Sequence, residues 1–317
     1  MKVTDYLEQA KKPLISFETI PPLKGKGIAA LYDVLDPLME FKPPFINVTY
    51  HRSDYIYKKT EADTFRKVVV RKRPGTVGIC AAIMNKYGVD AVPHLICGGF
   101  TRDTTEDALI DLDYLGVKNV LLLRGDSLKS ESAFRSEAGG HNFAHQLIEQ
   151  VMNMNRGIYL AEELQGASPT DFCIGVAGYP EKHFEAPNRK TDLKHLKQKI
   201  DQGGDYIVTQ MFFDNQQFFD FVKKCREIGI TVPIIPGLKP ISTLKQVVSI
   251  PRTFKVDLPE DLAEAVEKCK DNSEVRQVGK EWCIQQSKEL LEFGVPCIHY
   301  YTMGRVSTFV DIARSVF

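Results

Sequence analysis

Residues 206–237 read YIVTQMFFDNQQFFDFVKKCREIGITVPIIPG, and this stretch determines the fold that we expect. An apolar run, Tyr206–Phe213, is followed by an amphipathic segment, Asn215–Ile228, and then by a second apolar run, Val232–Gly237. Short apolar runs separated by helical spacing predict a strand, a helix and a second strand. Because several such runs are apolar on both faces, the strands should be parallel and covered by helices.

The same alternation extends along the whole chain. The further runs predicted as strands are Leu14–Ile20, Phe45–Tyr50, Val92–Cys97, Asn119–Arg124, Phe172–Tyr179 and Cys297–Tyr301. The further predicted helices are Thr104–Leu115, Lys190–Gln202, Pro259–Asp271, Glu274–Phe293 and Val306–Val316. Eight strands in one unbroken series predict an α/β fold, a (β/α)8 TIM barrel with extra helices. An open doubly wound sheet is the alternative.

One domain over residues 1–317 is the simplest organisation, since no linker or low-complexity segment interrupts the pattern. The charged segment Thr60–Arg73 is expected to be an exposed loop with a helix. Lys and Arg together number 41, as do Asp and Glu, so neither nucleic acid nor an anionic membrane is an expected partner.

Seven scattered cysteines without a C-x-x-C pair indicate reduced, packed thiols, with neither disulfides nor a metal site. The first residues lack the apolar stretch of a signal peptide. No apolar run approaches the ~18 residues of a membrane span. A cytoplasmic enzyme is therefore the expectation.

Polar side chains gather where the predicted strands end, which is where barrel enzymes carry their chemistry. Two of them are carboxylic acids, Glu18 and Asp126. Desolvation disfavours a charged carboxylate, so a carboxyl group in an apolar cleft can donate a proton near neutral pH. A second, ionised carboxylate could stabilise a cation. Such a pair also suits a glycosidase. A flavin-free barrel hydrolase and a catalytically silent ligand-binding barrel therefore remain alternatives.

The strand ends carry a series of motifs in a fixed order. They are F-E-x-x-P-P from residue 17, N-V-T-Y from 47, P-H-L from 93, L-R-G-D from 123, Y-P-E-x-H from 179, T-Q-x-F-F-D from 209, P-G-L-x-P-I from 236 and Y-Y-T-x-x-R from 300. Over nearly the whole chain, this series resembles the bacterial type of methylenetetrahydrofolate reductase.

The resemblance implies a barrel that binds FAD without a covalent bond. It implies that NADH or NADPH reduces the flavin in a ping-pong reaction, and that 5,10-methylenetetrahydrofolate then becomes 5-methyltetrahydrofolate, which feeds methionine synthesis. Relatives form homo-oligomers, so one is expected here. The chain is too short for the C-terminal regulatory domain of eukaryotic relatives, so no inhibition by S-adenosylmethionine is expected.

The resemblance also implies roles for individual residues. Glu18 matches the general acid, Asp126 the aspartate near flavin and folate, and Gln210 a glutamine shared by folate and nicotinamide. Tyr301 and Arg305 would bind the folate. The implied flavin contacts are Thr49, Tyr50, His94, Arg124, Gly125, Asp126, Ala144, Tyr179, His183, Ala186, Asp192 and Lys199. Of these, Asp192 and Lys199 share one helix face with His195, at i, i+3 and i+7.

At seven positions the chain departs from the family pattern, and two of them are Met303 and Gly304, which replace a leucine and an asparagine before Arg305. His51 and Arg52 replace small residues, His195 and Gln198 replace an asparagine and an arginine, and Leu244 replaces an aromatic residue. These departures concern the contacts of the dinucleotides and the choice between NADH and NADPH.

Overall fold

A ring of short parallel strands forms the centre of the molecule, as the computed structural model shows for residues 1–61, 63–128, 131–160, 164, 166–303 and 306–317. Its strands are β1 (Leu14–Thr19), β2 (Phe45–Val48), β5 (Asp90–Ile96), β6 (Asn119–Leu123), β7 (Cys173–Gly178), β8 (Tyr206–Thr209), β9 (Ile234–Ile235), β10 (Gly237–Leu238) and β11 (Cys297–Tyr301).

The strand order is β10-β11-β1-β2-β5-β6-β7-β8-β9, and every pairing in this sheet is parallel. Only Pro236 separates β9 from β10, so the two outer strands of the sheet are halves of one chain segment. The sheet is therefore a nearly closed barrel, which confirms the predicted fold class and excludes the open doubly wound sheet.

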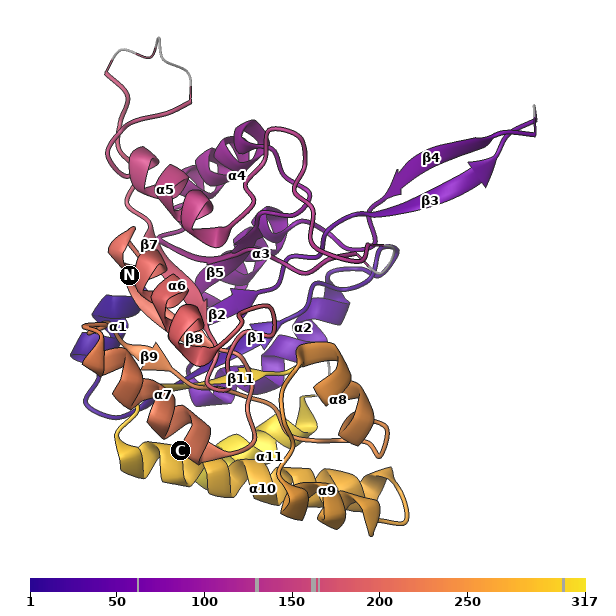
Figure 1. The fold of residues 1–317 in the computed structure, drawn as a ribbon, viewed down its shortest axis with the longest axis vertical. Coiled ribbons are helices and arrows are strands. Elements are labelled where there is room, and N and C mark those ends of the chain that lie inside the picture. Colours follow the sequence, from indigo (N-terminus) through magenta and orange to yellow (C-terminus); the bar gives the residue numbers. More distant parts are fainter. Residues whose placement is uncertain (62, 129–130, 161–163, 165, 304–305) are drawn as a thin grey trace.

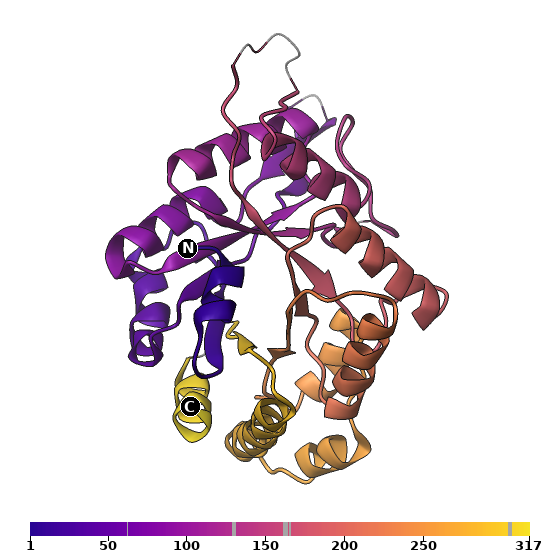
Figure 2. The ribbon, with the colours of Figure 1, turned by 90° about the vertical axis from the view of Figure 1, so that its left-hand side faces the viewer.

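Helices surround this barrel, as Figures 1 and 2 show. They are α1 (Val3–Gln9), α2 (Ala29–Leu35), the 3-10 helix η1 (Asp36–Phe41), α3 (Thr76–Tyr87), α4 (Arg102–Tyr114), α5 (Ala144–Met154), α6 (Arg189–Asp201), α7 (Asn215–Glu227), α8 (Gln246–Phe254), α9 (Glu260–Glu267), α10 (Asn272–Phe293) and α11 (Ser307–Val316). None of the helices in the described part of the chain is long and apolar enough to span a membrane.

The interior of the barrel changes from apolar to polar along its axis. At the amino ends of the strands, Phe45, Val92, Tyr206 and other inward side chains form one cluster with Val3 and Leu7 of α1. Helix α1 thus closes this end of the barrel (Figure 2). Polar inward-facing side chains follow toward the carboxyl ends, where the chemistry of barrel enzymes takes place.

The predicted strands all occur, but the run Tyr206–Phe213 leaves the sheet early, at Thr209. The carbonyl of Phe212 accepts a hydrogen bond from Gln286 Nε2 (3.0 Å), and that of Phe213 accepts one from Trp282 Nε1 (3.0 Å). Helix α10 therefore provides the hydrogen bonds that a neighbouring strand would otherwise make.

The prediction for residues 60–73 was wrong. Strands β3 (Asp54–Lys59) and β4 (Phe65–Val70) form an antiparallel hairpin that extends away from the barrel (Figure 1). The two strands are rich in aromatic and β-branched residues, which favours a hairpin here, and the many Lys and Arg residues obscured that preference. Helices α1, α2, η1, α3, α5 and α8 were also not predicted.

Candidate active site

Glu18 lies near the carboxyl end of β1 with 7% of its surface exposed. Its Oε2 atom is 3.5 Å from Nε2 of His94 on β5 and 3.8 Å from Nε2 of His299 on β11. No Lys or Arg side chain of the described residues forms an ion pair with Glu18. The carboxyl group is therefore buried between two imidazoles and is not held in a salt bridge with a permanent cation.

His94 is a neutral neighbour of Glu18. Burial is the largest effect on this imidazole and lowers its pKa to about 4, while the charge of Glu18 acts in the opposite direction. Nε2 lies 3.3 Å from the Asn47 amide nitrogen, and a neutral imidazole can accept a hydrogen bond there. The contact between His94 and Glu18 is thus a polar contact and not an ion pair at neutral pH.

His299 was not selected from the sequence, although it lies on the other side of Glu18. Its Nδ1 atom is 2.9 Å from the Ser16 hydroxyl, which fixes the ring, and its buried Nε2 atom has no hydrogen-bond partner in the structure. The spacing of polar residues along the two strands could have identified His299 from the sequence. Ser16 and Glu18, like His299 and Tyr301, alternate along otherwise apolar strands and so point to the same side.

Tyr301 of β11 pairs with Glu18 of β1 in the register of the two strands. Its pKa is raised well above the ordinary value, mainly by burial and next by the charge of Glu18. Its hydroxyl donates a hydrogen bond to the Thr209 carbonyl at 2.6 Å. Gly237 makes this position possible, because a β-carbon there would lie 2.4 Å from the Thr209 carbonyl oxygen and 2.5 Å from the Tyr301 ring. Gln210 directly follows Thr209 and is half-buried.

The turn after β6 brings Arg124, Gly125 and Asp126 to the same face of the barrel. Gly125 has a φ of +84°, and a β-carbon there would lie 3.1 Å from the Ile96 side chain, so the turn favours glycine strongly. Arg124 forms an ion pair with Glu185. Asp126 is exposed, and its charge acts on both Arg124 and Tyr179.

The loop after β7 and helix α6 form the next part of this face. The rings of Tyr179 and His183 meet edge to face with 4.7 Å between centroids, and the buried Asp192 accepts a hydrogen bond from the His183 backbone (3.1 Å). Lys199 donates to the Ala177 carbonyl, and burial lowers its pKa to about 8. The structure therefore brings Asp192 and Lys199 toward the site.

The remaining predicted contacts lie around this face. Thr49 donates from its hydroxyl to the Thr19 carbonyl (3.0 Å), and the ring of Tyr50 contacts Phe100 at 4.9 Å. Ala186 is buried in the loop after β7, and Ala144 is the first residue of α5. Arg305 lies outside the described residues.

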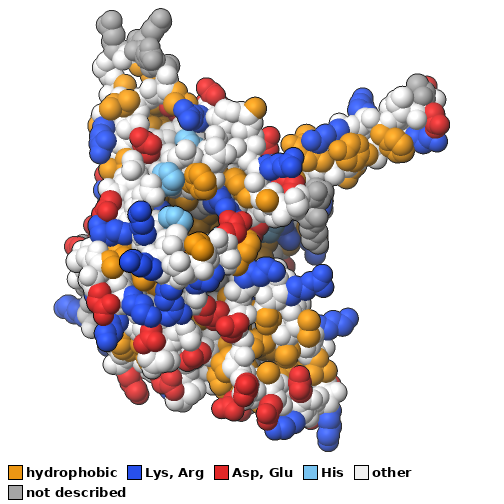
Figure 3. Space-filling view, viewed as in Figure 1, with side chains coloured by type: hydrophobic (Ala, Val, Ile, Leu, Met, Phe, Trp, Pro, Cys, Tyr) orange, Lys and Arg blue, Asp and Glu red, His pale blue; other side chains and the backbone are white. Residues whose placement is uncertain are grey.

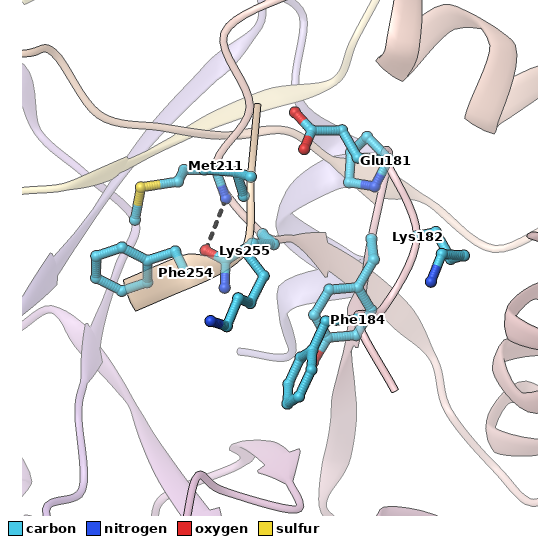
Figure 4. A pocket seen from close by; sticks show the side chains of 10 residues that line it. Glu181, Lys182, Phe184, Met211, Phe254 and Lys255 are labelled. Carbon is cyan, nitrogen blue, oxygen red and sulfur yellow. Dashed lines mark hydrogen bonds between the residues drawn. The ribbon is translucent and has the colours of Figure 1, made fainter. Parts of the chain in front are cut away.

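A pocket opens beside Gln210 (Figure 4). Its lining residues are Tyr179, Pro180, Glu181, Lys182, Phe184, Gln210, Met211, Phe254, Lys255 and Val256. Glu181 accepts a hydrogen bond from the Asp257 backbone (2.8 Å), which ties the loop after β7 to the segment that follows α8. Burial raises the pKa of Glu181 to about 7. This residue, too, was not selected from the sequence.

The residues that depart from the family pattern lie in different parts of the structure. Arg52 is buried in ion pairs with Glu131 (3.2 Å) and Glu137 (2.9 Å), and the charge of Glu18 acts on His51. His195 and Gln198 are exposed on α6, so the structure does not bring His195 to the site with Asp192 and Lys199. Leu244 is 39% exposed before α8.

Comparison with known proteins identifies a family. The family model described as methylenetetrahydrofolate reductase matches residues 2–316. Methylenetetrahydrofolate reductase 2 of Saccharomyces cerevisiae is 32% identical over 313 residues, covering 96% of this chain and 48% of the yeast protein. The 5,10-methylenetetrahydrofolate reductase of Escherichia coli is 31% identical over 307 residues, covering 95% of this chain and 90% of that protein. The chain spans about half the length of several eukaryotic relatives that it matches.

A solved structure has the same fold. It is an uncharacterized protein from Clostridium thermocellum, described as binding two copies of 5-methyl-5,6,7,8-tetrahydrofolic acid. The TM-score is 0.56 at 13% sequence identity, over 98% of this chain and 97% of the other. At this identity the likeness concerns the fold only, and it agrees with the barrel described above.

Proposed function

This chain belongs to the methylenetetrahydrofolate reductase family, and from that premise we propose that it reduces 5,10-methylenetetrahydrofolate to 5-methyltetrahydrofolate. The electron donor would be NADH or NADPH, since relatives carry one or the other in their names. FAD would be the bound carrier. The observation that carries the proposal is Glu18, a buried carboxyl group at a barrel strand end in a chain that matches this family almost throughout.

The residues at the carboxyl face of the barrel fit FAD. Arg124 and Lys199 supply cations that suit a diphosphate, and the Gly125 turn leaves the backbone open to close approach. The rings of Tyr179 and His183 offer surfaces for an aromatic group. The complete set of residues proposed to hold FAD is Thr49, Tyr50, His94, Arg124, Gly125, Asp126, Ala144, Tyr179, His183, Ala186, Asp192 and Lys199. When bound, FAD would carry hydride from the nicotinamide to the folate.

Glu18 is the proposed general acid of the folate half of the reaction. Its carboxyl group would give a proton to N10 of the folate, which opens the five-membered ring and leaves a cation at the carbon bonded to N5. Glu18 would then be ionised, with Nε2 of His94 at 3.5 Å and Nε2 of His299 at 3.8 Å as its neighbours. These imidazoles would orient the carboxyl group.

The other proposed site residues would bind and stabilise the folate. The Asp126 carboxylate, which is exposed in the structure, would stabilise the cation by its charge. Gln210 lines the pocket beside the site and would orient the folate and, in turn, the nicotinamide. Tyr301 and Arg305 would bind the folate. Because both co-substrates would use the same position, the kinetics should be ping-pong.

A cytoplasmic location is part of the proposal. All seven cysteines are free, which suits a reducing compartment. The product, 5-methyltetrahydrofolate, would feed methionine synthesis there.

The variant Glu18→Gln tests the assignment. It should bind FAD and be bleached by NADH or NADPH at the normal rate, yet fail to reoxidise when 5,10-methylenetetrahydrofolate is added. Stopped-flow absorbance of the two half-reactions measures this. Glu227→Gln, at an exposed position of α7, is the matched control and should behave as wild type.

Two outcomes would count against the proposal. Normal folate reduction by Glu18→Gln would remove Glu18 from the mechanism. A purified protein that is colourless and takes up no FAD would favour the hydrolase or the silent binding barrel instead, and glycoside turnover would separate those two.

A further inference from the structure

The β3–β4 hairpin is a part of the molecule that the proposed reaction does not use. We call β3 and β4 together the arm. The arm extends from the loop after β2 into solvent (Figure 1), and none of its residues belongs to a hydrophobic cluster of the described chain. A two-stranded hairpin is only marginally stable in water without a further surface to pack on.

The arm has an apolar face without a cover. Because directly paired residues share a face, Tyr57, Phe65 and Val69 lie on the same side of the hairpin. Their exposed fractions are 68%, 66% and 61%. A two-stranded sheet that faced only water would carry polar residues here, so a cluster of exposed apolar side chains indicates a binding surface.

The charge of the arm indicates what kind of surface would cover it. Residues 54–73 contain seven Lys or Arg and three Asp or Glu, whereas the whole chain carries equal numbers of both. The partner surface should therefore be apolar and acidic.

The chain itself has such a surface on α8 and α9. The acidic residues Glu260, Glu264 and Glu267 are all exposed and lie at i, i+4 and i+7, along one stripe of α9. Val248 of α8 is 70% exposed, and Ile250 of α8 and Leu262 of α9 belong to one buried cluster, so the two helices share a common core. Figure 3 shows apolar side chains over α8, acidic ones over α9, and basic and apolar ones on the arm.

We propose that the arm of one copy of this chain docks on the α8–α9 face of a second copy. The apolar face of the arm would cover Val248 while its basic residues meet the acidic stripe of α9. Two identical contacts related by a two-fold axis close the dimer, which is the commonest symmetry of soluble oligomers. Direct arm-to-arm pairing is disfavoured, because it would bring two basic segments together.

The proposed contact lies next to the active site. Phe254, at the end of α8, and the following Lys255 and Val256 line the pocket beside Gln210. An arm seated on α8 would hold this wall in place. Each copy would thus support the site of the other, independently of which reaction the site performs.

Sedimentation velocity of the full-length protein with FAD tests the proposal. Wild type should be a dimer. The double variant Phe65→Thr/Val69→Thr, which keeps residues of high strand preference, should raise the dissociation constant by at least about tenfold. The control Tyr114→Thr removes a ring that is 89% exposed on α4 and should leave the dimer unchanged.

A charge swap identifies the two surfaces. Lys67→Glu and Glu267→Lys should each weaken the homodimer, and a mixture of the two variants should restore association between unlike copies. Lys223→Glu, exposed on α7, is the control for charge change. A monomeric wild type, or a dimer that neither the double variant nor either charge change weakens, would overturn the proposal. So would weakening by Lys67→Glu but not by Glu267→Lys, since that pattern would indicate arm-to-arm pairing.

Discussion

At the scale of single residues, the site is defined by what surrounds Glu18. The carboxyl group has an imidazole on each side, one bonded to Asn47 and the other to Ser16. Only the bond from Ser16 is to the ring nitrogen that faces away from Glu18, and such a bond fixes the orientation of a catalytic imidazole. The pair Ser16 and His299 should therefore act as positioning residues for Glu18.

His299→Asn tests this role. The amide can replace Nδ1 in the hydrogen bond to Ser16 but cannot place an atom at Nε2, beside Glu18. The rate of the folate half-reaction should fall by roughly ten- to a hundredfold, with bleaching of the flavin by the nicotinamide unchanged. If both half-reactions slow equally, His299 has a general structural role and not a positioning one.

His94 should make stability depend on pH. Its pKa is about 4 in the folded protein and about 6.5 in an unfolded chain. Between these values the unfolded state binds more protons, so the free energy of unfolding falls as pH falls from 6.5 toward 4. The full effect amounts to roughly 3 kcal/mol.

Urea unfolding at pH 7 and pH 4.5 measures this contribution. Other groups also titrate in this range. The contribution of His94 is therefore obtained by comparing wild type with the variant His94→Gln. The variant should lose less stability than wild type between the two pH values. Equal losses in both proteins would contradict the assignment of a buried, neutral His94.

At the scale of elements, helix α10 replaces the sheet as the hydrogen-bond partner of residues 212 and 213. Gln286 is 4% exposed and donates to the Phe212 carbonyl, so Gln286→Leu leaves a buried acceptor without a partner. The free energy of unfolding should fall by about 1–3 kcal/mol. Gln285→Leu, the exposed neighbour, should change it by less than about 0.5 kcal/mol. Equal effects would show that α10 does not anchor this segment.

The same segment shows why the sequence predicted strands well but not their ends. The run YIVTQMFF is apolar throughout, and nothing in it marks Thr209 as the last strand residue, because the competing donors lie about 70 residues later on α10. The arm was missed for the opposite reason, since its pairing is local but its charges are typical of an exposed loop. The end of β8 and the hairpin both depend on burial and on the pairing partners of each segment. A local sequence pattern contains neither kind of information.

The residues of the candidate active site were also predicted only in part from the sequence. The strand-end position supplied Glu18, and the motif resemblance added His94 and Tyr301, which the structure brings close to Glu18. The resemblance could not supply His299, because the importance of His299 depends on a distance across the barrel, and Glu181, although part of the motif Y-P-E-x-H, was given no role. His195 shows the limit of helical spacing, since an i+3 position shares a face with Asp192 only approximately and ends up in solvent.

At the scale of the whole molecule, the barrel separates stability from chemistry along its axis. Side chains at the amino ends of the strands form a closed apolar cluster with α1, and polar groups occupy the carboxyl ends. Changes at the closed end should therefore alter unfolding without altering the reaction.

Leu7→Ala tests this separation. Leu7 is 9% exposed and packs from α1 into the barrel cluster, so its truncation should lower the free energy of unfolding by about 2–4 kcal/mol. The Michaelis constants and the turnover rate of the folded fraction should stay within about twofold of wild type, because the polar face is at the far end of the strands. Leu115→Ala removes the same atoms from a residue that is 41% exposed and should cost less than about 1 kcal/mol. A large change in turnover with little loss of stability would contradict this separation. It would mean that the packing of α1 affects the active site through the barrel interior.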